Sequence, residues 1–163
     1  MTPDTPFGPQ LCNCLALRQA ARLVTQLYDR HLARAGLRTT QFSVLAKLKR
    51  LGPMTINRLA DEMVMDRTTL GRNVLPLERD GLIAIKQGAA DRRHRELHLT
   101  KAGTDRLRRA LKLWEEAQSH FEEQFGVTRA AELRSELHAV AGLGQGPAAD
   151  RAADAQSTQH NSL

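Results

Sequence analysis

The sequence predicts a mainly helical protein, in which four helices, a short β-hairpin and two further helices follow one another along the chain. Three observations support this order. Apolar residues recur at helical spacing in each of the segments expected to be helices. Two short runs of alternating apolar residues, "LIAIK" and "ELHLT", flank a basic loop and therefore predict a hairpin. Two short strands form no stable core alone, so the hairpin must pack on the helices before it as a wing.

Composition narrows the class of protein before any motif is considered. Lysine and arginine total 24 against 18 aspartate and glutamate residues, which gives a net charge of +6. This basic balance favours nucleic acid or another anionic surface as partner. Aromatic residues make up only 4%, too few to stack several single-stranded bases. The length of 163 residues suits one domain with its own core.

The two termini of the chain and its cysteine content indicate the cellular compartment in which the protein is expected. Residues 1–9 hold three prolines and are expected to be a flexible leader, with neither the basic nor the apolar region of a signal peptide. Residues 143–163 show no periodicity and are expected to be a disordered tail. No run approaches the roughly 18 apolar residues of a membrane span. Two cysteines form no disulfide framework. We therefore expect a cytoplasmic protein with no membrane partner.

The first two helices are defined by clear stop signals. A broad apolar face predicts a helix over residues 10–35, with Gly36 as its stop. The segment "TTQFSVLAKLKRLG" predicts the second helix. Thr39 or Thr40 is expected to be its N-cap, and Gly52 with the following proline ends it.

The third and fourth helices fit a helix-turn-helix pattern. In "INRLADEMVMDRTTLGRN", residues 56–73, Leu59 and Ala60 lie on the inner face of the first helix, and Leu70 and Val74 face inward from the second. The connection "VMD" is short, and its aspartate, Asp66, suits the N-cap of the second helix. A proline at position 76 is expected to bend the later turns of that helix without disturbing the residues before it.

The outer face of the fourth helix carries residue types that read the DNA major groove. Arginine reaches the acceptors of guanine as a bidentate fork, asparagine pairs with adenine, and threonine offers a hydroxyl and a methyl group. Thr55, the expected cap of the third helix, and the free amides beside it suit a phosphate. The candidate base-reading residues are Arg67, Thr68, Thr69, Arg72 and Asn73.

The hairpin that follows directly concentrates positive charge at its tip. The loop in "KQGAADRRHRELHLT" contains Arg92, Arg93 and His94. A narrow minor groove has an enhanced negative potential that attracts inserted arginine, so this tip is expected to probe DNA. Asp91 is expected to hold one of the neighbouring arginines by a charge-assisted hydrogen bond. A recognition helix followed by such a hairpin is a winged helix-turn-helix arrangement.

Three segments together resemble the signature of the MarR family of bacterial transcription regulators. They are "LERDGLIAI", the Asp91–Arg93 "D-x-R" and "LHLTKAG" over 97–103. The resemblance extends over roughly residues 11–142. It implies an obligate homodimer in which the first, fifth and sixth helices interlock, and a winged helix in each subunit that reads half of a pseudo-palindromic operator in double-stranded DNA. It also implies a regulator, usually a repressor, that releases DNA when a small molecule or an oxidant arrives.

The resemblance assigns a role to each part of the chain. Residues 10–38 and 101–142 become the N- and C-terminal helices of a dimerisation domain, and residues 39–100 become the winged helix-turn-helix lobe. The recognition helix is expected over 66–80 and the wing over 86–96, with Arg93 as the minor-groove residue.

Apolar residues of the last two helices favour a homodimer independently of the resemblance. The domain is too thin to bury all of them, so a second subunit is expected to cover the remainder, whereas the alternative is a monomeric helical bundle. These residues are Leu107, Leu111, Trp114, Phe121, Phe125, Leu133, Leu137 and Val140.

Both cysteines, Cys12 and Cys14, lie near the start of the first helix, and several interpretations are open. Free cysteines often pack as small apolar residues. A helix N-terminus and a cation such as Arg18 favour a reactive thiolate, and the peroxide-sensing branch of the resembled family places its cysteine in a similar position. A metal site needs further ligands, because residues two apart on a helix point about 200° apart. An interchain disulfide is the fourth interpretation.

A small-molecule pocket is the rival to a cysteine sensor. In the resembled family, aromatic acids commonly lie between the DNA-binding lobe and the dimer helices. Tyr28, His31 and Phe42 are the candidates to line such a crevice, although Tyr28 and Phe42 also fit the core and His31 fits a satisfied core histidine.

The sequence therefore predicts a homodimeric, sequence-specific regulator that binds double-stranded DNA and represses transcription until a small aromatic ligand or an oxidant releases it. The alternative is a thiol-based redox or metal sensor of the same fold that acts through Cys12 and Cys14. A DNA module without sequence preference fits the Thr, Arg and Asn face less well. No enzyme motif is present: the chain has neither a Gly-rich phosphate loop nor metal-spaced His and Glu residues on one helix. No cofactor and no metal are expected.

Overall fold

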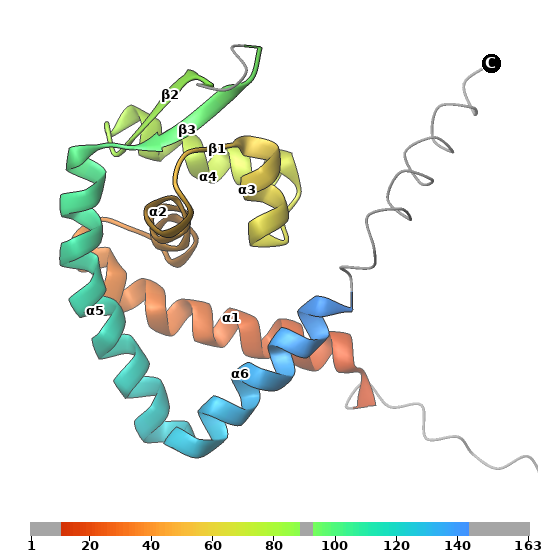
Figure 1. Ribbon diagram of the computed structural model, residues 1–163. Helices are drawn as coiled ribbons and strands as arrows, with labels where there is room; N and C mark the ends of the chain where they lie inside the picture. Colours follow the sequence, from red (N-terminus) through yellow and green to blue (C-terminus); the bar gives the residue numbers. More distant parts are fainter. Residues whose placement is uncertain (1–10, 89–92, 144–163) are drawn as a thin grey trace, which may run out of the picture. The chain divides into compact units, whose positions relative to one another are not determined.

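The computed structural model describes residues 11–88 and 93–143 (Figure 1). The chain forms two compact units, Met1–Phe121 and Glu122–Leu163. The leader predicted for residues 1–9 lies outside the described residues, as does the tail predicted for 143–163 from residue 144 onward.

The order of elements confirms the predicted fold class of helices with a hairpin between the fourth and fifth. The helical elements are α1 (Asn13–Leu32), η2 (Ala33–Ala35), α2 (Thr39–Leu51), α3 (Ile56–Met63), α4 (Arg67–Arg79), α5 (Lys101–Phe125) and α6 (Val127–Gly142). The strands are β1 (Met54–Thr55), β2 (Ile83–Gln87) and β3 (Arg95–Leu99).

The predicted helix ends follow from local chemistry. Gly36 and Gly52 end the first two helical segments at φ values of +68° and +80°, which a residue with a Cβ adopts only with strain. The Thr55 hydroxyl accepts the backbone N–H of residue 58 at 3.3 Å, and the Asp66 carboxylate accepts that of Thr69 at 2.8 Å. Both predicted N-caps are therefore confirmed.

The predicted N-cap of α2 is wrong. The cap is Arg38, and neither Thr39 nor Thr40 takes that position. Both the backbone N–H and the hydroxyl of Thr39 donate to the Asp29 carboxylate on α1, each at 2.7 Å. Because a carboxylate ten residues away satisfies these donors, Thr39 forms the first turn of the helix and leaves the cap to its neighbour.

The sheet has three strands rather than the predicted two. β1 pairs with β3, and β3 pairs with β2, all antiparallel, in the order β1-β3-β2. Met54 lies opposite Leu97, which itself lies opposite Ile85. β1 has only two residues and leads directly into α3, so it attaches the start of the helix-turn-helix to the wing.

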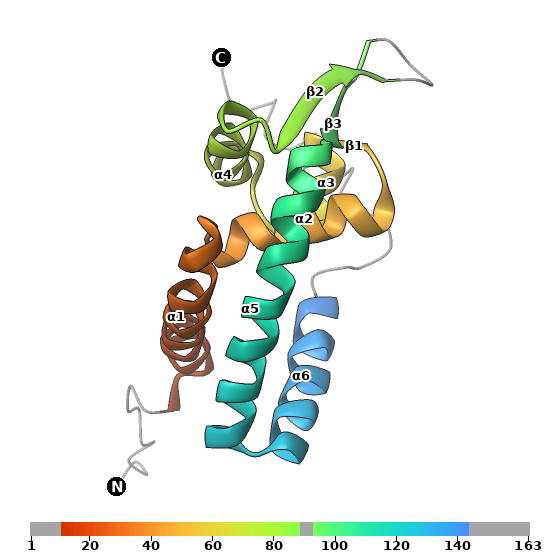
Figure 2. The ribbon, with the colours of Figure 1, turned by 90° about the vertical axis from the view of Figure 1, so that its left-hand side faces the viewer.

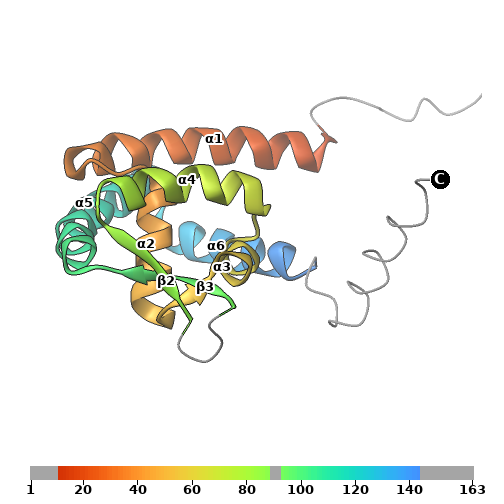
Figure 3. The same cartoon turned by 90° about the horizontal axis from the view of Figure 1, so that it is seen from above.

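One hydrophobic core joins α2, α3, α4 and the base of the wing to the end of α1 and the first half of α5. Figure 1 shows α3, α4 and the hairpin at one end of this unit and α1 toward the other, and Figure 3 looks onto α4 and the hairpin from that end. None of the described polar or charged residues is buried. The largest fully buried side chains are Leu32, Val44, Leu45, Met54, Leu59, Leu70, Leu77 and Ile83.

A hydrogen-bonded junction joins the end of α4, the wing and the start of α5. The Leu82 carbonyl oxygen accepts the backbone N–H of Thr100 at 3.1 Å. The Thr100 hydroxyl lies 2.7 Å from the Gly81 carbonyl oxygen and 3.0 Å from that of Leu82, and it accepts the N–H of Gly103 at 3.0 Å. Gly103 is buried against this junction. The motif "LTKAG" thus closes the wing onto the helix that follows it.

Among the helices within 11–88 and 93–143, none is both long enough and apolar enough to cross a membrane.

Gly103→Ala is expected to destabilise the protein, although alanine normally stabilises a helix relative to glycine. A Cβ at this position would lie 2.0 Å from the Leu82 carbonyl oxygen and 2.8 Å from a methyl group of Leu99. Backbone must therefore shift, and the expected loss is about 1–3 kcal/mol of unfolding free energy. Chemical denaturation measures it. Gly71→Ala in α4 is the control, since its Cβ would meet only the Ile56 side chain at 4.0 Å. Equal stability of the two variants would contradict the junction.

The stabilisation by Asp66 is expected to depend on pH. Hydrogen bonding from Thr69, first its side chain and then its backbone, holds the pKa of the Asp66 carboxyl below its ordinary value. A lowered pKa stabilises the fold above the ordinary aspartate range, and this stabilisation is lost as the pH falls through the folded pKa. Asp66→Asn keeps a cap acceptor without the charge. Its deficit in melting temperature against the wild type should shrink between about pH 6 and about pH 3. A constant deficit would show that the charge is irrelevant.

Candidate nucleic-acid interface

The N-terminal half of α4 presents the predicted base-reading residues on one side. Leu70, Val74 and Leu77 are buried in the core, which sets the rotation of the helix. The Arg67, Thr68 and Arg72 side chains are consequently exposed, and those of Thr69 and Asn73 are half-buried between the two faces. The Asp66 cap makes Arg67 the first residue of the helix.

Asn73 and Pro76 differ in how they affect this helix. The Asn73 side-chain amide donates to the Thr69 carbonyl oxygen at 2.9 Å, which orients the side chain along the helix. Pro76 lies within α4, which continues to Arg79. Proline has no N–H, so the carbonyl of residue 72 lacks its intrahelical partner, but the helix is complete over the residues that face outward before it.

Helix α3 packs closely on α4 and is joined to α2 by an ion pair. Leu59 and Ala60 are buried where the helix-turn-helix packs, and the small Ala60 allows close approach. Val64 ends α3 in the left-handed conformation with a φ of +51°. The Lys47 ammonium on α2 lies 3.2 Å from the Glu62 carboxylate on α3, which neutralises the charge of this acidic side chain.

The described part of the wing is basic and exposed. Arg93, His94 and Arg95 are all exposed, and the Gly88 N–H donates to the His94 carbonyl oxygen at 2.8 Å, which closes the hairpin before its tip. Arg92 and the expected Asp91 partner lie outside the described residues. Figure 1 shows the hairpin extending beyond the helices at the same end of the unit as α3 and α4.

Thr55 caps α3, as the sequence predicted, and it also belongs to strand β1, which the sequence did not predict. Its side chain is half-buried, its hydroxyl oxygen caps α3, and its backbone pairs with Glu96 of β3. The cap therefore lies beside the wing rather than on an isolated turn.

Two exposed cations beside the predicted site were not among its predicted residues. Arg58 lies in the first turn of α3, and Arg95 begins β3 opposite Gln87. The sequence signal for Arg95 is its place in the same basic segment as Arg93. No comparable signal exists for Arg58, because the helix-turn-helix pattern assigns α3 to packing.

Both candidate sensor cysteines are exposed. The Cys12 sulfur accepts the backbone N–H of Leu15 at 3.4 Å and is the N-cap of α1, and Cys14 lies in the first turn. Their exposure in the single chain favours a reactive thiol over buried apolar packing. In the part of the chain that the structure describes, no cluster of three or more His, Cys, Asp or Glu side chains could hold a metal ion.

The three predicted pocket residues, Tyr28, His31 and Phe42, all contact side chains of α5. Phe42 is buried and stacks on Trp114, with ring centroids 6.2 Å apart. The Tyr28 hydroxyl donates to the Gln118 side chain, and the His31 ring lies edge-on to that of His120 at 5.7 Å between centroids. These contacts join α1 and α2 to α5. Figure 2 shows α1 and α5 from the side of this contact.

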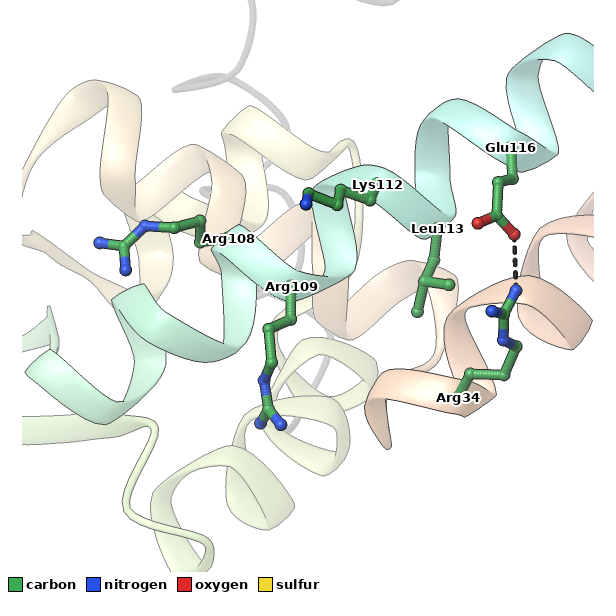
Figure 4. A pocket seen from close by; sticks show the side chains of 6 residues that line it. All are labelled: Arg34, Arg108, Arg109, Lys112, Leu113 and Glu116. Carbon is green, nitrogen blue, oxygen red and sulfur yellow. Dashed lines mark hydrogen bonds and ion pairs between the residues drawn. The ribbon is translucent and has the colours of Figure 1, made fainter.

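A pocket of about 410 Å³ lies instead between η2 and α5. It is lined by Arg34, Arg108, Arg109, Lys112, Leu113 and Glu116 (Figure 4). Sequence analysis missed it because its residues come from two segments more than seventy positions apart. The one available signal was the run of cations in "RLRRALKLW".

The apolar residues predicted to form a dimer divide into three groups, of which the half-buried one comprises Trp114, Phe121, Phe125 and Leu133. Leu107 is buried within the chain, whereas Leu111, Leu137 and Val140 are exposed by 41%, 38% and 47%. In α6, Ala130 is the one buried residue. The described chain therefore leaves apolar surface that it does not itself cover.

Comparison with known proteins agrees with this geometry. The family model described as MarR family matches residues 37–94, which run from just before α2 into the wing. YwoH, an uncharacterised helix-turn-helix regulator of Bacillus subtilis, is 33% identical over 85 residues, 52% of this chain and 61% of that protein. BadR, a transcriptional activatory protein of Rhodopseudomonas palustris, is 32% identical over 99 residues, 58% of this chain and 57% of that protein. The chain thus spans a little over half the length of these curated relatives.

A solved structure extends the similarity to most of the chain. The transcriptional regulator MosR of M. tuberculosis, in complex with DNA, is 34% identical, and the match covers 82% of this chain and 96% of that one with a TM-score of 0.72. The family consists of transcriptional regulators and not of enzymes. With the helix-turn-helix, the wing and the "LTKAG" junction all in place, the chain belongs to the MarR family.

Proposed function

We propose that the chain is a homodimeric regulator that binds a pseudo-palindromic operator in double-stranded DNA in the cytoplasm and represses transcription from it. The observation that carries this proposal is the exposed face of α4, with Arg67, Thr68 and Arg72, followed directly by a wing that exposes Arg93. Both elements lie at the same end of the unit, where one duplex can meet them.

The two basic elements serve different grooves. Arg72 and Asn73 suit the base edges of the major groove, because arginine forms a bidentate pair with guanine and asparagine with adenine. Arg93 at the wing suits the minor groove, whose negative potential attracts arginine where the groove is narrow. Arg58, Arg95 and the hydroxyl of Thr55 supply further contacts of the kind that phosphates accept.

Exposed apolar residues support the homodimer. α1 exposes Leu15, Leu17 and Leu23, and α6 exposes Leu137 and Val140. A second copy that covers these helices removes the apolar surface from water. It also places two recognition helices about one helical turn of DNA apart, which a pseudo-palindromic operator matches.

The signal that releases DNA is proposed to act on the exposed thiols of Cys12 and Cys14. Their exposure gives an oxidant access, and the Leu15 N–H that donates to the Cys12 sulfur fixes this thiol at the exposed start of α1. An aromatic ligand beside Tyr28 and His31 is the second candidate, favoured by the half-buried position of both side chains between α1 and α5.

Arg72→Ala is expected to weaken operator binding by about 1–3 kcal/mol and to relax base preference, whereas Arg93→Ala weakens binding through the wing. Fluorescence anisotropy with a duplex from upstream of the protein's own gene, in excess random DNA, measures both. Lys49→Ala, which removes an exposed cation from the end of α2, is the control. Operator affinity that both arginine variants retain would place the interface elsewhere.

Oxidation is expected to release the operator through the thiols. The same anisotropy titration is repeated after mild hydroperoxide treatment. Wild-type protein should lose affinity, and Cys12→Ser or Cys14→Ser should retain it, according to which thiol is the switch. Binding that hydroperoxide leaves unchanged would exclude the thiol mechanism and leave the aromatic ligand as the remaining candidate.

A further inference from the structure

The pocket between η2 and α5 is strongly basic. Four of its six lining residues are cationic, and Glu116 is its one acidic residue. Figure 4 shows Arg109 and Leu113 pointing down from α5, Arg108 and Lys112 pointing to the left, and Arg34 reaching toward Glu116 from the neighbouring segment. The pocket therefore combines cations from two elements that are distant in the sequence.

Two of the four cations already have partners within the chain. The Arg34 guanidinium forms an ion pair with Glu116, and the Arg108 guanidinium lies 3.1 Å from the Asp105 carboxylate. No described residue forms an ion pair or hydrogen bond with the side chain of Arg109 or Lys112. The pocket thus retains two unpaired positive charges.

The spacing of these charges indicates the chemistry of an occupant. Arg109 and Lys112 are three residues apart on α5, so they lie side by side on the helix surface, about 5–6 Å apart at their Cβ atoms. Two adjacent anionic groups on one molecule match that spacing. A volume of about 410 Å³ falls in the range of small-molecule sites. Leu113 adds one apolar side chain to the lining.

We propose that this pocket binds a small molecule with two adjacent anionic groups, such as a diphosphate, through Arg109 and Lys112. A concave pocket closed on one side by Arg34 suits a compact anion better than the rod of a DNA duplex. None of Tyr28, His31 and Phe42 lines the pocket, although His31 lies 3.7 Å from the Glu116 carboxylate, so the pocket adjoins the aromatic-ligand candidate without sharing its residues. Anion binding needs no DNA, and the inference does not rest on the proposed function.

Substitution of Glu116 provides a variant whose affinity for the anion should rise rather than fall. Its carboxylate contributes the one negative charge of the lining and holds Arg34 in an ion pair. A bound anion is repelled by this carboxylate and competes with it for Arg34. Glu116→Gln therefore removes a repulsion and releases a cation, and the site should bind the anion more tightly.

The first experiment is isothermal titration of the full chain with inorganic pyrophosphate at constant ionic strength. Wild-type protein should show saturable binding. The double variant Arg109→Gln/Lys112→Gln should bind at least about tenfold more weakly, because hydrogen bonds to charged groups contribute on the order of 1.5–3 kcal/mol each. Lys49→Gln/Arg50→Gln, which removes two exposed cations from the end of α2, should bind as the wild type does. Circular dichroism establishes that each variant is folded.

Three outcomes would overturn the proposal. Wild-type protein that shows no saturable binding has no such site. An equal loss in both double variants means that pyrophosphate is attracted by net charge alone. Glu116→Gln that binds pyrophosphate more weakly than the wild type means that Glu116 organises the site rather than opposing the anion.

A titration with random duplex DNA distinguishes a site for a small anion from a site that contacts the phosphates of the DNA backbone. Binding of a random duplex should fall by no more in Arg109→Gln/Lys112→Gln than in Lys49→Gln/Arg50→Gln. A selective loss in the former would assign these cations to the DNA backbone and reject the small-molecule site. The pyrophosphate titration contains no DNA, so its result stands even where the proposed regulator function fails.

Discussion

The carbonyl oxygen of Leu82 holds together α4, the wing and α5, and the arrangement of these three elements depends on it. Gly81, with a φ of +69°, lets the chain turn out of α4, and the Leu82 N–H returns to the Leu77 carbonyl oxygen at 2.8 Å. The Leu82 carbonyl oxygen then accepts hydrogen bonds from the backbone N–H and the hydroxyl of Thr100. The end of α4, the base of the wing and the first turn of α5 therefore share one set of hydrogen bonds. The wing cannot tilt relative to α4 without breaking it.

The elements that sequence analysis predicted well are those whose causes are local. A threonine or aspartate caps a helix when its side-chain oxygen accepts the unsatisfied N–H three residues later, and the local sequence was enough to predict this for Thr55 and Asp66. Glycines at helix ends are equally local, because the left-handed conformation excludes most other residues. The apolar spacing of Leu70 and Val74 fixes which side of α4 faces outward, and with it the candidate base-reading residues.

The features that were missed depend on residues far apart in the sequence. Thr39 was predicted to cap α2 because its local context suits a cap, but Asp29 on the preceding helix accepts its donors. β1 has only two residues and no periodicity of its own, so only its partner β3 defines it. The basic pocket exists because the end of α1 packs on α5, and neither segment alone predicts a cavity. Local chemistry thus predicts elements and caps, whereas pairings between elements need the fold.

Helix α5 links the wing to the contacts made by α1. Its first turn is joined to the wing through Thr100, and Glu116 and Gln118, four to five turns later, contact the end of α1. Between them Ala110 and Ala117 are fully buried, and such small side chains hold the helix backbone close to the core. The part of α5 that contacts α1 and the part that is joined to the wing belong to one continuous helix. A displacement of α1 against α5 is therefore transmitted to the wing without a flexible segment in between. Because Arg34 on η2 pairs with Glu116, the basic pocket lies against the middle of the same helix whose first turn is joined to the wing.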